Sequence, residues 1–132
     1  MSTIGNYLRD KLLNEAIGAV AFAPAATLEI RLFSTVLTAA GVGTEIANTG
    51  YARKTINNDT TNFPNSSTGS KTNAVRIDFD DATEDWDDIL AVGLFDSANN
   101  LYFFKNLDAP VSIANTFHLY FDIGDLNFSL SS

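Results

Sequence analysis

The chain has 132 residues, of which 45% are hydrophobic and 18% charged, and this length predicts one domain over residues 1–132 with a single buried core. Eight basic and sixteen acidic residues give a net charge of −8, which argues against nucleic acid and anionic membranes as partners because both attract clustered Lys and Arg. The sequence has no cysteine, which excludes disulfides, thiolate nucleophiles and cysteine-ligated metal sites.

Residues 1–20 are predicted to form one amphipathic helix. Apolar residues recur at three- and four-residue spacing from Thr3 to about Ile17, with polar residues between them. We expect Ser2 or Thr3 to cap the helix and Gly18 to end it. Periodicity shows a buried face but not its partner, so the helix packs either on the domain's own sheet or on a neighbouring subunit.

The same N-terminal stretch carries charged residues through its middle, so it lacks the uninterrupted apolar region of a signal peptide. No segment of the chain approaches the roughly 20 apolar residues of a membrane-spanning helix. We therefore expect synthesis and assembly in a cytoplasm.

From residue 27 onward, alternating and short apolar runs predict about eight strands. These runs occupy residues 27–33, 51–56, 74–79, 90–95, 101–105, 111–114, 117–121 and 126–130. Two tight polar links predict hairpins, one joining 90–95 to 101–105 and the other joining 117–121 to 126–130. The pattern predicts a mainly β fold, an antiparallel β-sandwich with a jelly-roll-like arrangement over residues 27–132.

Two long connections separate the first strands. Residues 34–50 contain glycines and small residues and are expected to form a loop with at most one helical turn. Residues 57–73 are nearly all polar or turn-forming, so they are either a solvated surface loop or a loop that contacts a partner.

Seven carboxylates fall within eleven positions between Asp78 and Asp88, around the only tryptophan, Trp86. Carboxylates so dense must mostly face water or a cation, whereas a large apolar ring among them is expected to point inward as a structural anchor. The spacing fails the helix-loop-helix calcium pattern, because Thr83 and Ile89 occupy the positions of the required glycine and glutamate.

Two interpretations of this acidic stretch remain open. Asp80, Asp81 and Asp85 are weak candidates for an irregular oxygen site for a hard cation. Alternatively, Thr83 caps a single helical turn whose first positions are acidic.

Nothing in the sequence indicates catalysis or a cofactor. The single histidine, His118, shares a strand face with Tyr120, and no Gly-x-Ser-x-Gly elbow is present. Aromatic residues on the C-terminal strands predict either a sheet buried on both faces or a sugar-stacking platform that includes Tyr102 and Tyr120. Candidates for an interface are apolar or aromatic residues of the helix and these strands: Ile4, Tyr7, Leu8, Leu12, Tyr102, Phe104 and Tyr120.

Several motifs occur together and in order: NYLRDKLLNEAI, PAATLEIRLF, GVGTEIANTGYARKTI, NAVRIDFDDATEDWDDILAVGLFD, LYFFKNLDAPVSIANTF and IGDLNFSL. In this order they resemble a family of small tailed-bacteriophage virion structural proteins, commonly labelled tail fibre or head decoration proteins. The resemblance covers nearly the whole chain. Its shared positions include Gly43, Thr44, Glu45, Tyr51, Ala52 and Arg53, and the Ala-Thr-x-x-Trp turn before the Gly-Leu-Phe-Asp strand end.

The resemblance implies a non-enzymatic structural protein of the virion that is made in the bacterial cytoplasm. Expected partners are further copies of the chain, with a trimer as one option, and the major capsid or tail proteins. A carbohydrate-binding module for host surface glycans is the alternative function.

Overall fold

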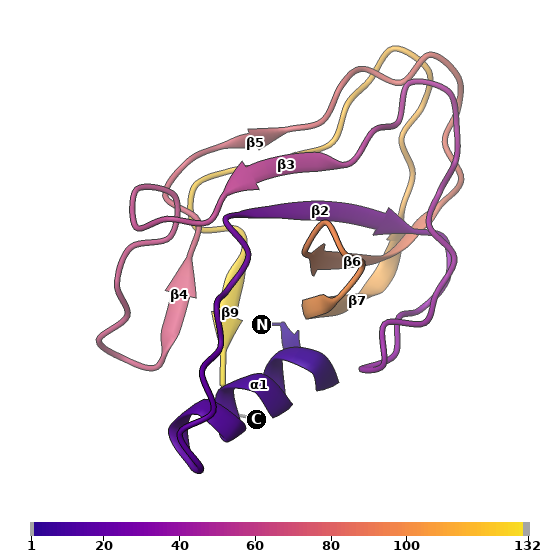
Figure 1. Ribbon diagram of the computed structural model, residues 1–132. Helices are drawn as coiled ribbons and strands as arrows, with labels where there is room; N and C mark the ends of the chain where they lie inside the picture. The colour runs from indigo at the N-terminus through magenta and orange to yellow at the C-terminus, as the bar shows by residue number, and fades with distance from the viewer. Residues whose placement is uncertain (1, 131–132) are drawn as a thin grey trace.

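The computed structural model describes residues 2–130, which form one helix and nine mostly short strands (Figure 1). The mainly β prediction is confirmed, although several strands are shorter than expected. The elements in chain order are β1 (Thr3–Ile4), α1 (Asn6–Ala16), β2 (Thr27–Phe33), β3 (Lys54–Asn57), β4 (Ser70–Thr72), β5 (Ile77–Asp78), β6 (Ile89–Phe95), β7 (Leu101–Val111), β8 (Tyr120–Phe121) and β9 (Asn127–Ser129).

The central sheet has five strands in the order β1-β7-β6-β2-β3, and all neighbours are antiparallel. Its hairpin β6–β7 is the first of the two predicted. The buried carboxylate of Asp96 holds the turn, because its Oδ1 accepts the backbone N–H groups of Ala98 and Asn100 at 2.9 and 2.8 Å. An aspartate at this place is typical of such turns. The strand β7 also runs through Pro110 to Val111, so the separate strand predicted at 111–114 does not form.

The second predicted hairpin is wrong. The strand β8 pairs with β5, and β9 pairs with β4, so the two strands diverge after the turn at residues 122–125. The physical reason is Asn73, which is fully buried: its Nδ2 donates to the carbonyls of Val75 and Asp122, and its Oδ1 accepts the N–H of Leu126. One asparagine thereby holds both sides of the turn against another segment of the chain.

Both faces of the central sheet are covered. One face packs against α1, the small sheets and the acidic segment, in a cluster that includes Leu8, Leu32 and Trp86. The other face packs under the loop that follows β2, through Phe33, Leu37 and other apolar residues. The alternation in residues 27–33 is typical of a half-buried strand, but β2 is buried on both faces toward its end because the loop folds back over it.

The helix α1 begins at Asn6, later than predicted, and neither Ser2 nor Thr3 caps it. Gly5 precedes the first helical residue and forms no side-chain capping bond. Residues Thr3 and Ile4 instead form β1 against β7, and Ser2 Oγ donates to the carbonyl of Asn127 at 2.6 Å. The helix packs on β7 of its own chain. Within residues 2–130, no helix combines the length and apolarity needed to cross a membrane.

Candidate functional site

The acidic segment of residues 78–88, which we call the acidic corner, is held between two other loops. The N–H of Trp86 donates to the carbonyl of Ile113 at 2.9 Å, and the N–H of Ala82 donates to the carbonyl of Phe117 at 2.8 Å. On the other side, the N–H of Thr83 reaches the carbonyl of Thr49. The corner thus ties together three parts of the chain that are far apart in the sequence.

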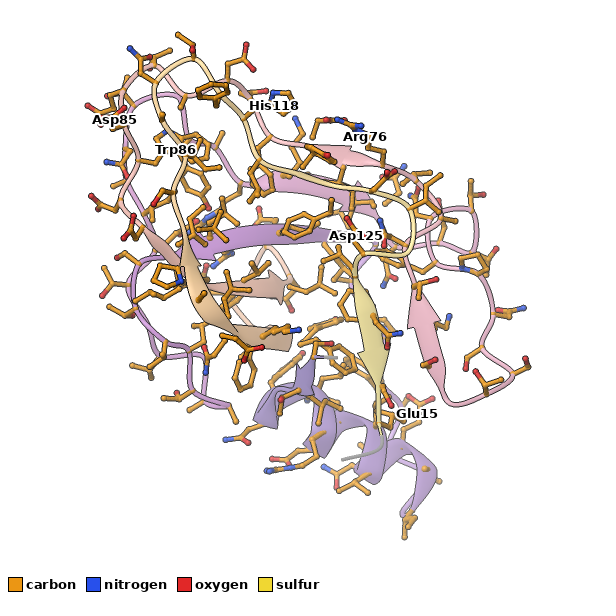
Figure 2. The ribbon with its side chains drawn as sticks, turned by 180° about the vertical axis from the view of Figure 1, so that it is seen from behind. Glu15, Arg76, Asp85, Trp86, His118 and Asp125 are labelled. Atoms are coloured by element: carbon orange, nitrogen blue, oxygen red, sulfur yellow. The ribbon has the colours of Figure 1, made fainter. Side chains whose placement is uncertain are left out.

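Trp86 is the buried centre of this corner, with 5% of its surface exposed. Its Nε1 donates to the carbonyl of Thr49 at 3.1 Å, and its ring meets the ring of Tyr51 edge to face at 5.7 Å. Figure 2 shows the ring turned into the molecule while Asp85 lies at the outer edge. A buried tryptophan with its N–H paired is an anchor and offers no exposed binding surface.

Gly50 makes the close approach of the two loops possible. Its φ of +90° lies in the left-handed region, and a Cβ there would lie 2.8 Å from the carbonyl oxygen of Asp81 and 2.9 Å from the nitrogen of Thr83. A side chain at this position would separate the loops and expose the tryptophan.

The three carboxylates considered for a cation do not converge. Asp80 lies 3.6 Å from the Lys54 ammonium, Asp81 lies 3.2 Å from His118, and Asp85 accepts the N–H of Asn115 at 2.8 Å. Within residues 2–130, no three His, Cys, Asp or Glu side chains are grouped so as to hold a metal ion. The structure therefore does not bring these three carboxylates together into one site, because each has a different protein partner.

The predicted helical turn after Thr83 is also wrong. Residues 83–84 form a bend, and Glu84 reaches across to the neighbouring loop, where it accepts the N–H of Thr49 at 2.9 Å. This bond, followed by one from the Asn48 side chain, lowers the pKa of the fully exposed Glu84 carboxyl. Glu84 and Asp85 of the corner thus serve as acceptors for loop N–H groups.

His118 lies in a surface cluster with Arg76, Asp78 and Tyr120. Its Nε2 and Nδ1 lie 3.3 and 3.2 Å from the carboxylates of Asp78 and Asp81. The guanidinium of Arg76 lies 3.9 Å from the centre of the Tyr120 ring and also binds Asp78. Asp78 and Tyr120 are also paired with each other in the short β5–β8 ladder, so the contacts within the cluster support this pairing.

The proposed sugar platform is not assembled. Tyr102 is buried, with its hydroxyl accepting the N–H of Ala25 at 3.1 Å and its ring stacked on Tyr7 at 6.1 Å. Tyr120 is partly exposed, but Arg76 covers one side of its ring. The two tyrosines therefore do not form one stacking surface.

Most of the predicted interface residues face the chain's own core. Leu8, Tyr102 and Phe104 are buried, and Ile4, Tyr7 and Leu12 are half-buried against the core, which leaves Tyr120 as the exposed member. The apolar face of the helix therefore packs on the core of its own domain, as is usual for an amphipathic surface helix. The large apolar side chains exposed within residues 2–130 are Leu13, Ile17, Val20, Val36, Val42, Phe117, Tyr120, Ile123 and Leu130.

A polar network lies beside β2, and the periodicity of the sequence does not indicate it. Glu45 accepts a hydrogen bond from the Tyr51 hydroxyl at 2.6 Å and two close bonds from Arg53, at 2.8 and 2.9 Å. The Tyr51 oxygen in turn accepts the N–H of Leu32 at 3.1 Å. Glu45, Tyr51 and Arg53 belong to the shared Gly-Thr-Glu and Tyr-Ala-Arg motifs, which are the one sign of this network in the sequence.

The network shifts the pKa values of its members. Burial raises the pKa of Glu45, but hydrogen bonds from Arg53 and Tyr51 and the charges of Arg53 and Arg31 outweigh it, so the net shift is downward from 4.5. Burial and the bond to Glu45 together raise the pKa of Tyr51. At neutral pH, a charged Glu45 thus accepts from a neutral Tyr51 and a charged Arg53.

Replacing Glu45 by glutamine is expected to lower the free energy of unfolding at neutral pH. A depressed folded-state pKa gives stability that is present above pH 4.5 and is lost as pH falls through the folded value. The difference between wild type and Glu45→Gln should therefore be largest at neutral pH and should shrink below pH 4.5. Urea denaturation of both proteins at a series of pH values measures it, and a difference that is constant with pH would contradict the assignment.

A family model described as "Podophage GP4 fiber I protein gp80" matches residues 3–129 of the chain. No protein with a curated description matches the chain. The family match spans nearly all of the described residues, including the acidic corner and the network around Glu45.

Proposed function

Because the chain belongs to the podophage GP4 fiber I protein gp80 family, we propose that it is a non-enzymatic structural component of a phage fibre that assembles in symmetric copies on the particle. The observation that carries this proposal is the family match over residues 3–129. The description of the family as a fiber protein favours a fibre over a capsid-decorating role. Further copies of the chain and the tail or major capsid proteins are the proposed partners.

The surface of the chain supports an assembly role. Large apolar side chains are exposed in three parts of the described chain: the end of α1 and its following turn, the loop after β2, and the C-terminal segment from residue 117. Single exposed apolar residues are common on monomers, but several of them in one small domain favour contacts with other proteins.

The surface cluster around His118 supports a structural role better than a catalytic one. Both ring nitrogens face carboxylates, one of which also binds Arg76, and the neighbouring Tyr120 ring is covered on one side by Arg76. We therefore propose no enzymatic activity and no glycan platform here. A glycan array with hits that depend on Tyr120 would contradict this part of the proposal.

Particles that lack this protein test the fibre proposal directly. Purified protein added to such particles should bind at defined positions, and a reconstruction or immunogold labelling should place it on a fibre. Labelling of the capsid shell instead would favour the decorating role. Failure to bind any phage particle would contradict both.

A further inference from the structure

An apolar groove of about 340 Å³ opens beside α1, between the helix, the segment leading into β2 and the strands β4 and β9. Polar groups lie among its lining residues, including the exposed Lys71 of β4. Leu130 is 66% exposed while it lines the groove, so the groove is open to solvent there. Its main apolar lining residues are Leu12, Phe22, Phe63, Tyr102, Phe128 and Leu130.

A rigid acidic turn at residues 122–125 presents one apolar side chain. Asp122 N–H donates to the Asp125 carboxylate at 2.8 Å, and the Asp125 N–H returns a bond to the Asp122 carbonyl at 3.0 Å. Gly124 N–H donates to the carbonyl of the buried Asn73, which fixes the turn to the body of the domain. At its apex Ile123 is 65% exposed between the two aspartates.

We propose that the groove of one copy binds the Ile123 turn of a second copy of this chain. A pre-organised apolar side chain loses little entropy when it enters an apolar groove, and an isoleucine is small enough for this volume. Charge favours this turn over the exposed valines of the loop after β2, because its two aspartates would meet Lys71 at the rim. The exposed valines of the loop after β2 have no acidic residue beside them in the sequence.

The contact joins two different surfaces, so each copy keeps one groove and one turn for its neighbours. The turn directly precedes β9, and Phe128 and Leu130, which line the groove, lie within and just after it. Such contacts close reciprocally into a pair or continue around a ring. The inference rests on the proposed assembly of symmetric copies and names the surfaces that make it.

Sedimentation velocity of purified full-length variants tests the contact. Ile123→Ser should weaken self-association at least about tenfold, because the apolar side chain is lost from the groove. Asp122→Asn with Asp125→Asn keeps the oxygen acceptors of the turn but removes its charge, and Lys71→Glu reverses the rim; both should weaken association. Phe117→Ser is the matched control, since Phe117 is 64% exposed and lies outside the contact.

Mixing two defective chains gives the decisive result. Ile123→Ser retains an intact groove, and Leu130→Glu retains an intact turn while it places a charge at the groove mouth. Each variant alone should be largely monomeric, but a fluorescently labelled Ile123→Ser chain should associate with unlabelled Leu130→Glu. Circular dichroism of each variant should match that of wild type.

Failure of the mixed pair to associate, or wild-type self-association that is unchanged by the Ile123 and Lys71 variants, would overturn the contact. A wild-type monomer at all concentrations would also overturn it. The fibre proposal is judged separately, by whether the protein binds particles that lack it. A monomer that still binds those particles would overturn the contact and leave the fibre proposal standing.

Discussion

Replacing Trp86 by alanine is expected to lower the free energy of unfolding by about 3–5 kcal/mol, the usual range for removing a buried aromatic side chain. The ring is 5% exposed and lies where the acidic corner, the loop at Thr49 and the core meet. Its loss would leave a cavity against Tyr51 and free the carbonyl of Thr49 from its partner. Urea denaturation followed by far-UV circular dichroism measures the change, because the variant no longer contains tryptophan.

Trp86→Phe is the matched control. It keeps an aromatic ring in the core but removes the indole N–H, so its cost should be smaller, about 1–3 kcal/mol. A loss under about 1 kcal/mol for Trp86→Ala, the range of ordinary surface changes, would show that the ring does not anchor the corner.

Elements whose formation depends on nearby residues were predictable from the sequence. The strand β2 coincides with the predicted span 27–33, and β6–β7 forms the predicted hairpin. In both, the alternation of apolar residues and the turn chemistry at Asp96 act over short separations. The inward position of Trp86 follows from a similar local contrast, a large ring among charges.

Features that depend on distant partners were not predictable. The buried Asn73 separates β8 from β9, yet an asparagine in a polar loop carries no mark of burial in the sequence. The short strand β4 lies within the segment predicted to be loop for the same reason, because only its partner β9 defines it. Periodicity also could not show that the loop after β2 covers the second face of the sheet.

The same limit applies to the candidate site. The helical stripe containing Leu8 and the aromatic Tyr102 and Phe104 are apolar because they form the core, and sequence cannot separate core from interface. The exposed positions, such as Ile123, stand outside any periodic pattern. They become visible only when the strands that flank them are placed.

A second large effect is expected at the buried ion pair of β2. The Arg31 guanidinium has a side-chain exposure of 5% and lies 2.6 Å from Glu29 Oε1, with its face 4.4 Å from the centre of the Phe95 ring. Glu29 is 19% exposed, and its carboxylate forms the ion pair with this charge. Removing it would leave the buried Arg31 charge with the Asp96 carbonyl, the Phe95 ring and the more distant Glu45 carboxylate.

Replacing Glu29 by leucine should therefore lower the free energy of unfolding by about 2–4 kcal/mol, somewhat below the range for fully buried pairs because Glu29 is partly exposed. Lys54→Ala, which breaks an exposed pair at 3.6 Å to Asp80, is the control and should cost less than about 1 kcal/mol.

Combining Glu29→Leu with Arg31→Met separates the pair's own contribution from the cost of an unpaired charge. The double variant carries no buried charge at this site and places two apolar side chains against Phe95 and its neighbours, so it should be more stable than Glu29→Leu alone. Denaturation of the four proteins of this cycle gives the coupling energy between the two positions. Additive costs for the two substitutions would show that the guanidinium does not depend on Glu29. A strongly non-additive result would show that the carboxylate is needed mainly because the arginine is buried.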